Sequence, residues 1–111
     1  MRSNSMDSKL TDIFWAPAEN GPARELFEGS RLRTLWEGEN GAKSQVLGMN
    51  PGTCGEDLDV HEPGDVFVVS GVFDDRIRDY PAGIFIHAPE GSSHIPQSQI
   101  GCILFLFYPE G

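Results

Sequence analysis

The sequence predicts an all-β protein, in which short antiparallel strands roll into a small barrel. Apolar runs rich in Val and Phe, at residues 66–73 and 84–86, are separated by turn residues such as Gly71, Pro81 and Gly83. Such runs favour strands over helices, and no helical period of useful length occurs in the chain. Histidines stand at both ends of this region, at His61 and His94, which is where barrel strands bring side chains together.

The chain's size and charge restrict its organisation and its partners. Its 111 residues correspond to one domain. Residues 1–10 are largely polar and are expected to form a flexible extension, leaving residues 11–111 for the barrel. The net charge of −9 disfavours nucleic acid and anionic membrane surfaces as partners, because both are negatively charged.

The cysteines and the hydropathy pattern predict a cytoplasmic location. Cys54 and Cys102 match neither a zinc finger nor a C-x-x-C redox motif, and free thiols are typical of a reducing compartment. The N-terminus lacks the apolar region of a secretory signal. The longest apolar run, residues 103–108, is too short to span a bilayer.

Turn residues and alternation place the strands. They are expected at residues 24–27, 32–36, 43–49, 57–61, 65–73, 84–87 and 101–108, with another short strand opening at His94. Asn40-Gly41 predicts a turn with positive φ angles. The segments 65–73 and 101–108 are apolar on both faces, so both faces need a cover. We expect the barrel interior to cover one face and a second sheet or subunit the other, which predicts a homodimer.

Several histidines and carboxylates are candidate metal ligands. Alternation along residues 57–61 puts Asp57, Asp59 and His61 on one face of the strand. Imidazole and carboxylate ligands suit Zn²⁺, Fe²⁺, Mn²⁺ or Ni²⁺. The third histidine, His87, is expected at the surface or a subunit interface.

The second half of the chain resembles the cupins, a family of small jelly-roll (RmlC-like) barrels. The resemblance lies in the motif G-x5-P-x-G-x2-H, present here from Gly83 through Pro89 and Gly91 to His94. The chain is more closely similar to the cupin domain of ChrR-type anti-sigma factors, through V-V-S-G-V-F-D-D, Y-P-A-G-I, A-P-E-G-S-S-H and Gly101-Cys102. A complete ChrR-type regulator also carries a helical zinc-binding domain. The few residues before Thr11 leave no room for one, so this chain alone is not expected to act as that anti-sigma factor.

The other cupin motif, G-x5-H-x-H-x3-E-x6-G, is only partly present. Asp59 stands where the family has its first histidine, and His61 and Asp65 keep the spacing of the second histidine to the acid. Five residues separate Asp65 from Gly71, where the family has six. Since a slip of one residue reverses the faces of a strand, two alternatives remain open. Either a bulge returns Asp65 to the interior, or Asp65 points outward and the ligand set differs.

The resemblance implies a divalent-metal site at His61, Asp65, His94 and Asp59, with Glu62 as an alternative ligand. Phe67, Val69, Phe85 and Cys102 are expected to line the adjoining pocket. Three functions follow: a metal-binding cupin that binds or transforms a small molecule, a ChrR-like sensor module without the sigma-binding domain, or a metal-free structural or ligand-binding barrel. An enzyme of this kind would be dioxygenase-, isomerase- or hydrolase-like, but the sequence does not decide whether catalysis occurs.

Overall fold

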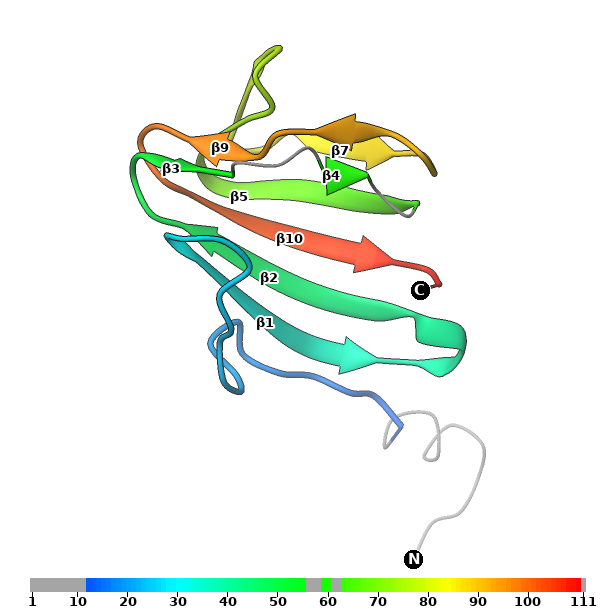
Figure 1. Ribbon diagram of the computed structural model, residues 1–111. Helices are drawn as coiled ribbons and strands as arrows, with labels where there is room; N and C mark the ends of the chain where they lie inside the picture. The colour runs from blue at the N-terminus through cyan, green and yellow to red at the C-terminus, as the bar shows by residue number, and fades with distance from the viewer. Residues whose placement is uncertain (1–11, 56–58, 61–62, 111) are drawn as a thin grey trace, which may run out of the picture.

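A computed structural model of the chain describes residues 12–55, 59–60 and 63–110, and it leaves the side chains of Asp59, Val60 and His94 undescribed. The regular elements of the described residues are antiparallel strands, apart from one short 3-10 turn at Glu39–Gly41, and residues 12–29 precede the first strand (Figure 1). Within these ranges, no helix has the length and hydropathy needed to cross a membrane. The predicted all-β class is therefore confirmed.

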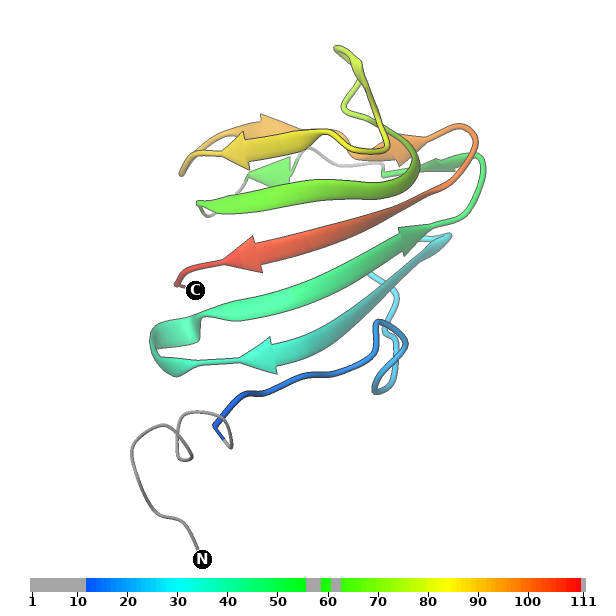
Figure 2. The ribbon, with the colours of Figure 1, turned by 180° about the vertical axis from the view of Figure 1, so that it is seen from behind.

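Four strands form one curved layer in the order β1, β2, β10 and β5, as Figures 1 and 2 show from opposite sides. The long β5 also pairs with β7 through its first half and with β6 and β9 through its end, while β3 pairs with β9. β4 and β8 form a separate pair, on the same side of the curled sheet as β3, β7 and β9 (Figure 1). The result is a half-open antiparallel barrel. Its strands are β1 (Ser30–Glu37), β2 (Lys43–Met49), β3 (Thr53–Cys54), β4 (Asp59–Val60), β5 (Gly64–Asp74), β6 (Asp79–Pro81), β7 (Phe85–Ala88), β8 (Ser93–His94), β9 (Gln97–Ser98) and β10 (Cys102–Tyr108).

A bulge in β5 decides which residues face the interior. Val68 pairs with Leu104 and Ser70 pairs with Ile103, so β10 offers no residue opposite Val69. Such an extra residue shifts the alternation of the strand by one. Val66 and Val68 are accordingly buried before the bulge, and Phe73 is buried after it.

The core lies on the concave side of the sheet. It comprises Leu32, Leu47, Met49, Val66, Val68, Phe73, Cys102, Leu104 and Leu106. On the opposite, outer face, Phe67, Val69 and Phe105 remain 43%, 50% and 37% exposed. In the single chain, the core therefore covers the concave faces of β5 and β10, and their outer faces stay exposed. The second sheet or subunit that the sequence predicts over those outer faces is not part of the described fold.

Turn chemistry explains one prediction that is confirmed and one that is wrong. Asn40 and Gly41 have φ angles of 60° and 82°, as the Asn-Gly pair predicts. The strand expected at residues 24–27 is reduced to one bridge between Arg24 and Leu32. The reason is Ser30, whose buried Oγ accepts hydrogen bonds from the backbone N–H groups of Leu26 and Phe27 at 3.1 and 3.0 Å, turning the chain there into a tight loop.

Candidate functional site

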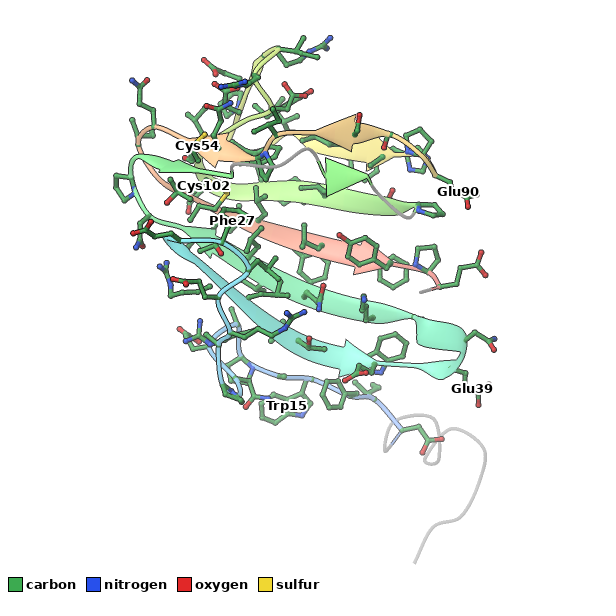
Figure 3. All side chains as sticks on the ribbon, in the orientation of Figure 1. Trp15, Phe27, Glu39, Cys54, Glu90 and Cys102 are labelled. Carbon is green, nitrogen blue, oxygen red and sulfur yellow. The ribbon has the colours of Figure 1, made fainter. Side chains whose placement is uncertain are left out.

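The concave side of the sheet encloses an apolar cavity of about 100 Å³. Side chains from the loop before β1 and from β2, β5, β7 and β10 line it, including Phe27, Leu47, Ile86 and Leu104. Figure 3 labels Phe27, which comes from that loop and packs against the core. A concave apolar space with few polar groups is the usual form of a small-molecule site.

Three polar side chains, those of Asp75, Tyr80 and Tyr108, border this cavity, and Asp75 and Tyr80 form a pair. The Tyr80 hydroxyl donates a hydrogen bond to Asp75 Oδ2 at 2.7 Å, and the Tyr80 ring stacks on Phe73 with its centroid 6.0 Å away. The backbone N–H groups of Ile77 and Arg78 donate to Asp75 Oδ1 at 2.9 and 3.0 Å. This pair was not predicted from the sequence. An Asp two and three residues before the N–H groups that it binds is the turn signal that could have revealed it.

Hydrogen bonding sets the protonation of this pair. Burial raises the pKa of Asp75, but the bonds from Tyr80 and from the Arg78 and Ile77 backbone outweigh it, and the net pKa is lowered. Burial, followed by the hydrogen bond to Asp75, raises the pKa of Tyr80. Asp75 is therefore a carboxylate at neutral pH, and Tyr80 keeps its proton.

Two of the predicted metal ligands are brought together by the backbone. β4 pairs with β8 in a register that sets Asp59 directly opposite His94, although 35 positions separate them in the chain. The predicted ligands His61 and Glu62 lie outside the described residues. Among the residues that the structure describes, no cluster of three or more His, Cys, Asp or Glu side chains is arranged to hold a metal.

Asp65 lies beside His87, which was not among the predicted metal ligands. It lies before the bulge at Val69, in phase with the exposed Phe67, so the bulge does not return it to the interior. Its Oδ1 is 2.8 Å from Nδ1 of His87 on the paired strand β7. The side chains of His87 and Asp65 are 61% and 41% exposed. Of the two alternatives left open by the motif spacing, the structure has the one in which Asp65 points outward.

Strand alternation puts three of the four predicted pocket residues on the outer face of the sheet. Phe67, Val69 and Phe85 lie on the outer face, where Phe85 is 61% exposed, and they do not border the cavity. The residues one position away from Phe67 and Phe85, Val66 and Ile86, line it instead.

The two cysteines are both free and have different surroundings. Cys102 is buried in the core, with its Sγ 3.7 Å from Met49 Sδ, and burial raises the pKa of its thiol. Cys54 is exposed in a wide, open groove beside the loop before β1 (Figure 3). The burial of Cys102 means that it serves as a small core residue.

Comparison with known proteins gives one family and a set of similar folds. The ChrR Cupin-like domain family matches residues 10–109. No curated protein sequence is significantly similar to the chain.

Three solved structures illustrate the shared fold. An RmlC-like cupin from Shewanella frigidimarina is 20% identical, with a TM-score of 0.71, and the match covers 88% of this chain and 92% of that one. An acetylacetone dioxygenase from Acinetobacter johnsonii is 12% identical, with a TM-score of 0.73 and coverages of 87% and 74%. A chain in the complex of Rhodobacter sphaeroides SigE with the anti-sigma ChrR is 23% identical, with a TM-score of 0.69, and the match covers 82% of this chain and 50% of that one. At these identities the likeness establishes the fold.

Proposed function

Because this chain belongs to the ChrR cupin-like domain family and has the cupin fold, we propose that it binds a small molecule in the barrel cavity and holds a divalent metal through Asp59, His61 and His94. The β4–β8 register carries the metal proposal. Residues directly opposite in an antiparallel pair share a face, with Cβ atoms about 5 Å apart. His61 itself lies outside the described residues, and its inclusion rests on the sequence, in which it follows Asp59 by two positions and alternation predicts the same face.

This ligand set differs from the one implied by the family motif. Asp65 is engaged by His87 on the outer face, so the acid of the proposed set is Asp59. Two imidazoles and one carboxylate suit Zn²⁺, Fe²⁺, Mn²⁺ or Ni²⁺ and leave positions for other ligands. A metal held in this way supplies a Lewis acid that polarises a carbonyl or activates water. The free thiols Cys54 and Cys102 are consistent with a cytoplasmic location.

The metal proposal predicts different metal contents for two histidine variants. Wild-type protein reconstituted with Fe²⁺, Mn²⁺, Ni²⁺ or Zn²⁺ and then desalted is expected to retain one of these metals stoichiometrically. His94→Ala is expected to lose it, because one neutral ligand is removed. His87→Ala is the matched control, since His87 is engaged with Asp65 on the outer face, and it is expected to retain the metal. Elemental analysis of the three proteins measures the difference.

Two results would count against this site. Wild-type protein without metal after all four reconstitutions would favour the metal-free ligand-binding barrel. Equal retention by His94→Ala and the wild type would remove His94 from the ligand set.

We also propose that two copies associate through the outer face of the sheet. Phe105 on β10 pairs with Phe67 on β5, which pairs with Phe85 on β7, so a phenylalanine row crosses three strands. Val69 and Ile103 extend the exposed apolar surface. A contiguous exposed patch of this kind is typical of an interaction surface.

Charge supports a second copy as the occupant. Arg31 and Arg33 lie on β1, at one side of the sheet, and their neighbours Leu32 and Thr34 pair with the buried Leu47 and Gln45 of β2. Asp65 lies on the outer face of β5, toward the opposite side. Two such faces related by a twofold axis parallel to the strands would set the arginines of each copy on the side of the other copy that carries Asp65.

Light scattering coupled to gel filtration at micromolar concentration tests this association. The wild type is expected to elute as a dimer, and Phe67→Ser as a monomer, because the substitution removes the centre of the phenylalanine row. Ile77→Ser is the control, since Ile77 is 81% exposed at the tip of the β5–β6 hairpin and outside the outer face, and it is expected to stay dimeric. A monomeric wild type would overturn the proposal.

A further inference from the structure

Asp75 and Tyr80 form a polar pair at the border of a largely apolar cavity, which Tyr108 also lines. β5 and β6 hold the pair in place, since Phe73 and Tyr80 are register partners and their rings stack. The pair faces the same space as Val66, Leu104 and Leu106, which come from the core. A ligand that fills this space would therefore meet mainly apolar walls, the Asp75–Tyr80 pair and Tyr108.

The hydrogen bonds that Asp75 and Tyr80 already make determine which further hydrogen bonds they can form with a ligand. Asp75 Oδ1 already accepts two backbone N–H groups, from Ile77 and Arg78. The hydroxyl hydrogen of Tyr80 is donated to Asp75 Oδ2. A phenol has one hydrogen to donate, and a carboxylate has none. Within the hydrogen bonds of the described residues, the remaining capacity of the pair, on Tyr80 Oη and Asp75 Oδ2, is that of acceptor lone pairs.

We propose that the Asp75–Tyr80 pair recognises a hydrogen-bond donor, a hydroxyl or an ammonium group, on a ligand whose apolar part enters the cavity. This inference rests on the proposed small-molecule function of the barrel and names its substrate class. A ligand carboxylate brings no hydrogen and is repelled by the Asp75 carboxylate, so it is rejected. The lowered pKa of Asp75 and the raised pKa of Tyr80 agree with this polarity.

The size of the cavity limits the buried part of the ligand. Its volume of about 100 Å³ is smaller than the ~150 Å³ of an apolar cavity that binds benzene in another protein. A short aliphatic chain fits such a space, and any bulkier part of the ligand would extend out of it. The substrate class is thus a small aliphatic alcohol or amine, or a larger molecule that presents one.

Three probes that share a four-carbon chain test the donor requirement. They are 1-butanol, butylammonium and butyrate, each titrated into ¹⁵N-labelled full-length protein and followed by amide chemical shifts. Butanol and butylammonium are expected to shift the amides of residues 75–80 and of β10 saturably, with butyrate at least about tenfold weaker, as expected for the loss of hydrogen bonds to a charged group. Tighter binding of butylammonium would identify an amine as the preferred donor, and tighter binding of butanol a hydroxyl.

Two substitutions separate recognition from folding. Asp75→Asn replaces an acceptor oxygen with an N–H donor and is expected to weaken butylammonium at least about tenfold while improving butyrate. Asp79→Asn is the matched control, because Asp79 lies on the same hairpin but does not border the cavity, and it is expected to leave all three affinities unchanged. Preserved amide spectra of the free variants verify that each one folds.

The titrations distinguish a failure of the donor requirement from a failure of ligand binding in the cavity. Equal binding of all three probes would overturn the donor requirement and leave ligand binding in the cavity intact. Unchanged affinities in Asp75→Asn would remove Asp75 from recognition. No shift at cavity residues with any probe would overturn both this inference and the proposed small-molecule function.

Discussion

Replacing Gly71 with alanine is expected to destabilise the fold by about 3 kcal/mol or more. Gly71 has a φ of 75°, which L-residues with a side chain adopt only at a cost. A Cβ atom at this position would lie 2.0 Å from the carbonyl oxygen of Gly101 and 2.7 Å from Cα of Cys102. Both are backbone atoms, so β5 and β10 would have to separate, and these strands form the centre of the sheet. Chemical denaturation monitored by far-UV circular dichroism measures the loss.

Gly83→Ala separates the two contributions to this cost. Gly83 has a φ of 94°, but nothing lies within 4 Å of the position that a Cβ atom would occupy there, so alanine is strained without clashing. It is expected to lose only about 1–2 kcal/mol. A Gly71→Ala variant no less stable than Gly83→Ala would contradict the close approach of β5 and β10 at Gly71.

Leu104→Ala is expected to cost about 2–5 kcal/mol in the free energy of unfolding. Leu104 is 2% exposed, sits at the middle of the central strand β10 and pairs with the buried Val68 and Leu47. Its truncation leaves a void that this packed interior fills only in part. Urea denaturation of the purified variant gives the value.

The adjacent residue on β10 provides the matched control. Ile103 is 41% exposed on the outer face, so Ile103→Ala is expected to cost about 1 kcal/mol or less. Equal losses for Leu104→Ala and Ile103→Ala would mean that the two faces of β10 are covered to the same extent. That outcome would reject the assignment of the concave side as the core.

Local chemistry made much of the fold predictable. The Asn40-Gly41 turn has the predicted positive φ angles, and the strand expected at residues 43–49 is β2. The family resemblance rested partly on Gly71 and Gly101, and the structure supplies a reason for each. β5 and β10 approach so closely at Gly71 that only hydrogen fits, and Gly101 has a φ of 94°, which favours glycine. Turn propensity and alternation act over a few residues, so a single sequence contains them.

The sequence predicted the types of residue in the candidate site better than their arrangement in space. Asp59 and His94 were named from the motif, and their direct pairing across β4 and β8 agrees with a common site. Phe67 was expected to line the pocket, and Asp65 was left with an inward and an outward alternative. Both lie on the outer face, because the bulge that shifts the phase of β5 comes after them, at Val69. The spacing of five residues between Asp65 and Gly71 signalled an irregularity, but it did not locate it.

An antiparallel β-barrel of the cupin kind, with its main strands and turns and a set of candidate acids and histidines, could be read from the order of the amino acids alone. The folded chain was needed to show which side of each strand is inside, that Asp65 pairs with His87, and that Asp75 and Tyr80 border the cavity. The physical reason is that alternation defines two faces without saying which one is buried. Pairing between β5 and β10, distant in the chain, makes that choice through register and one bulge.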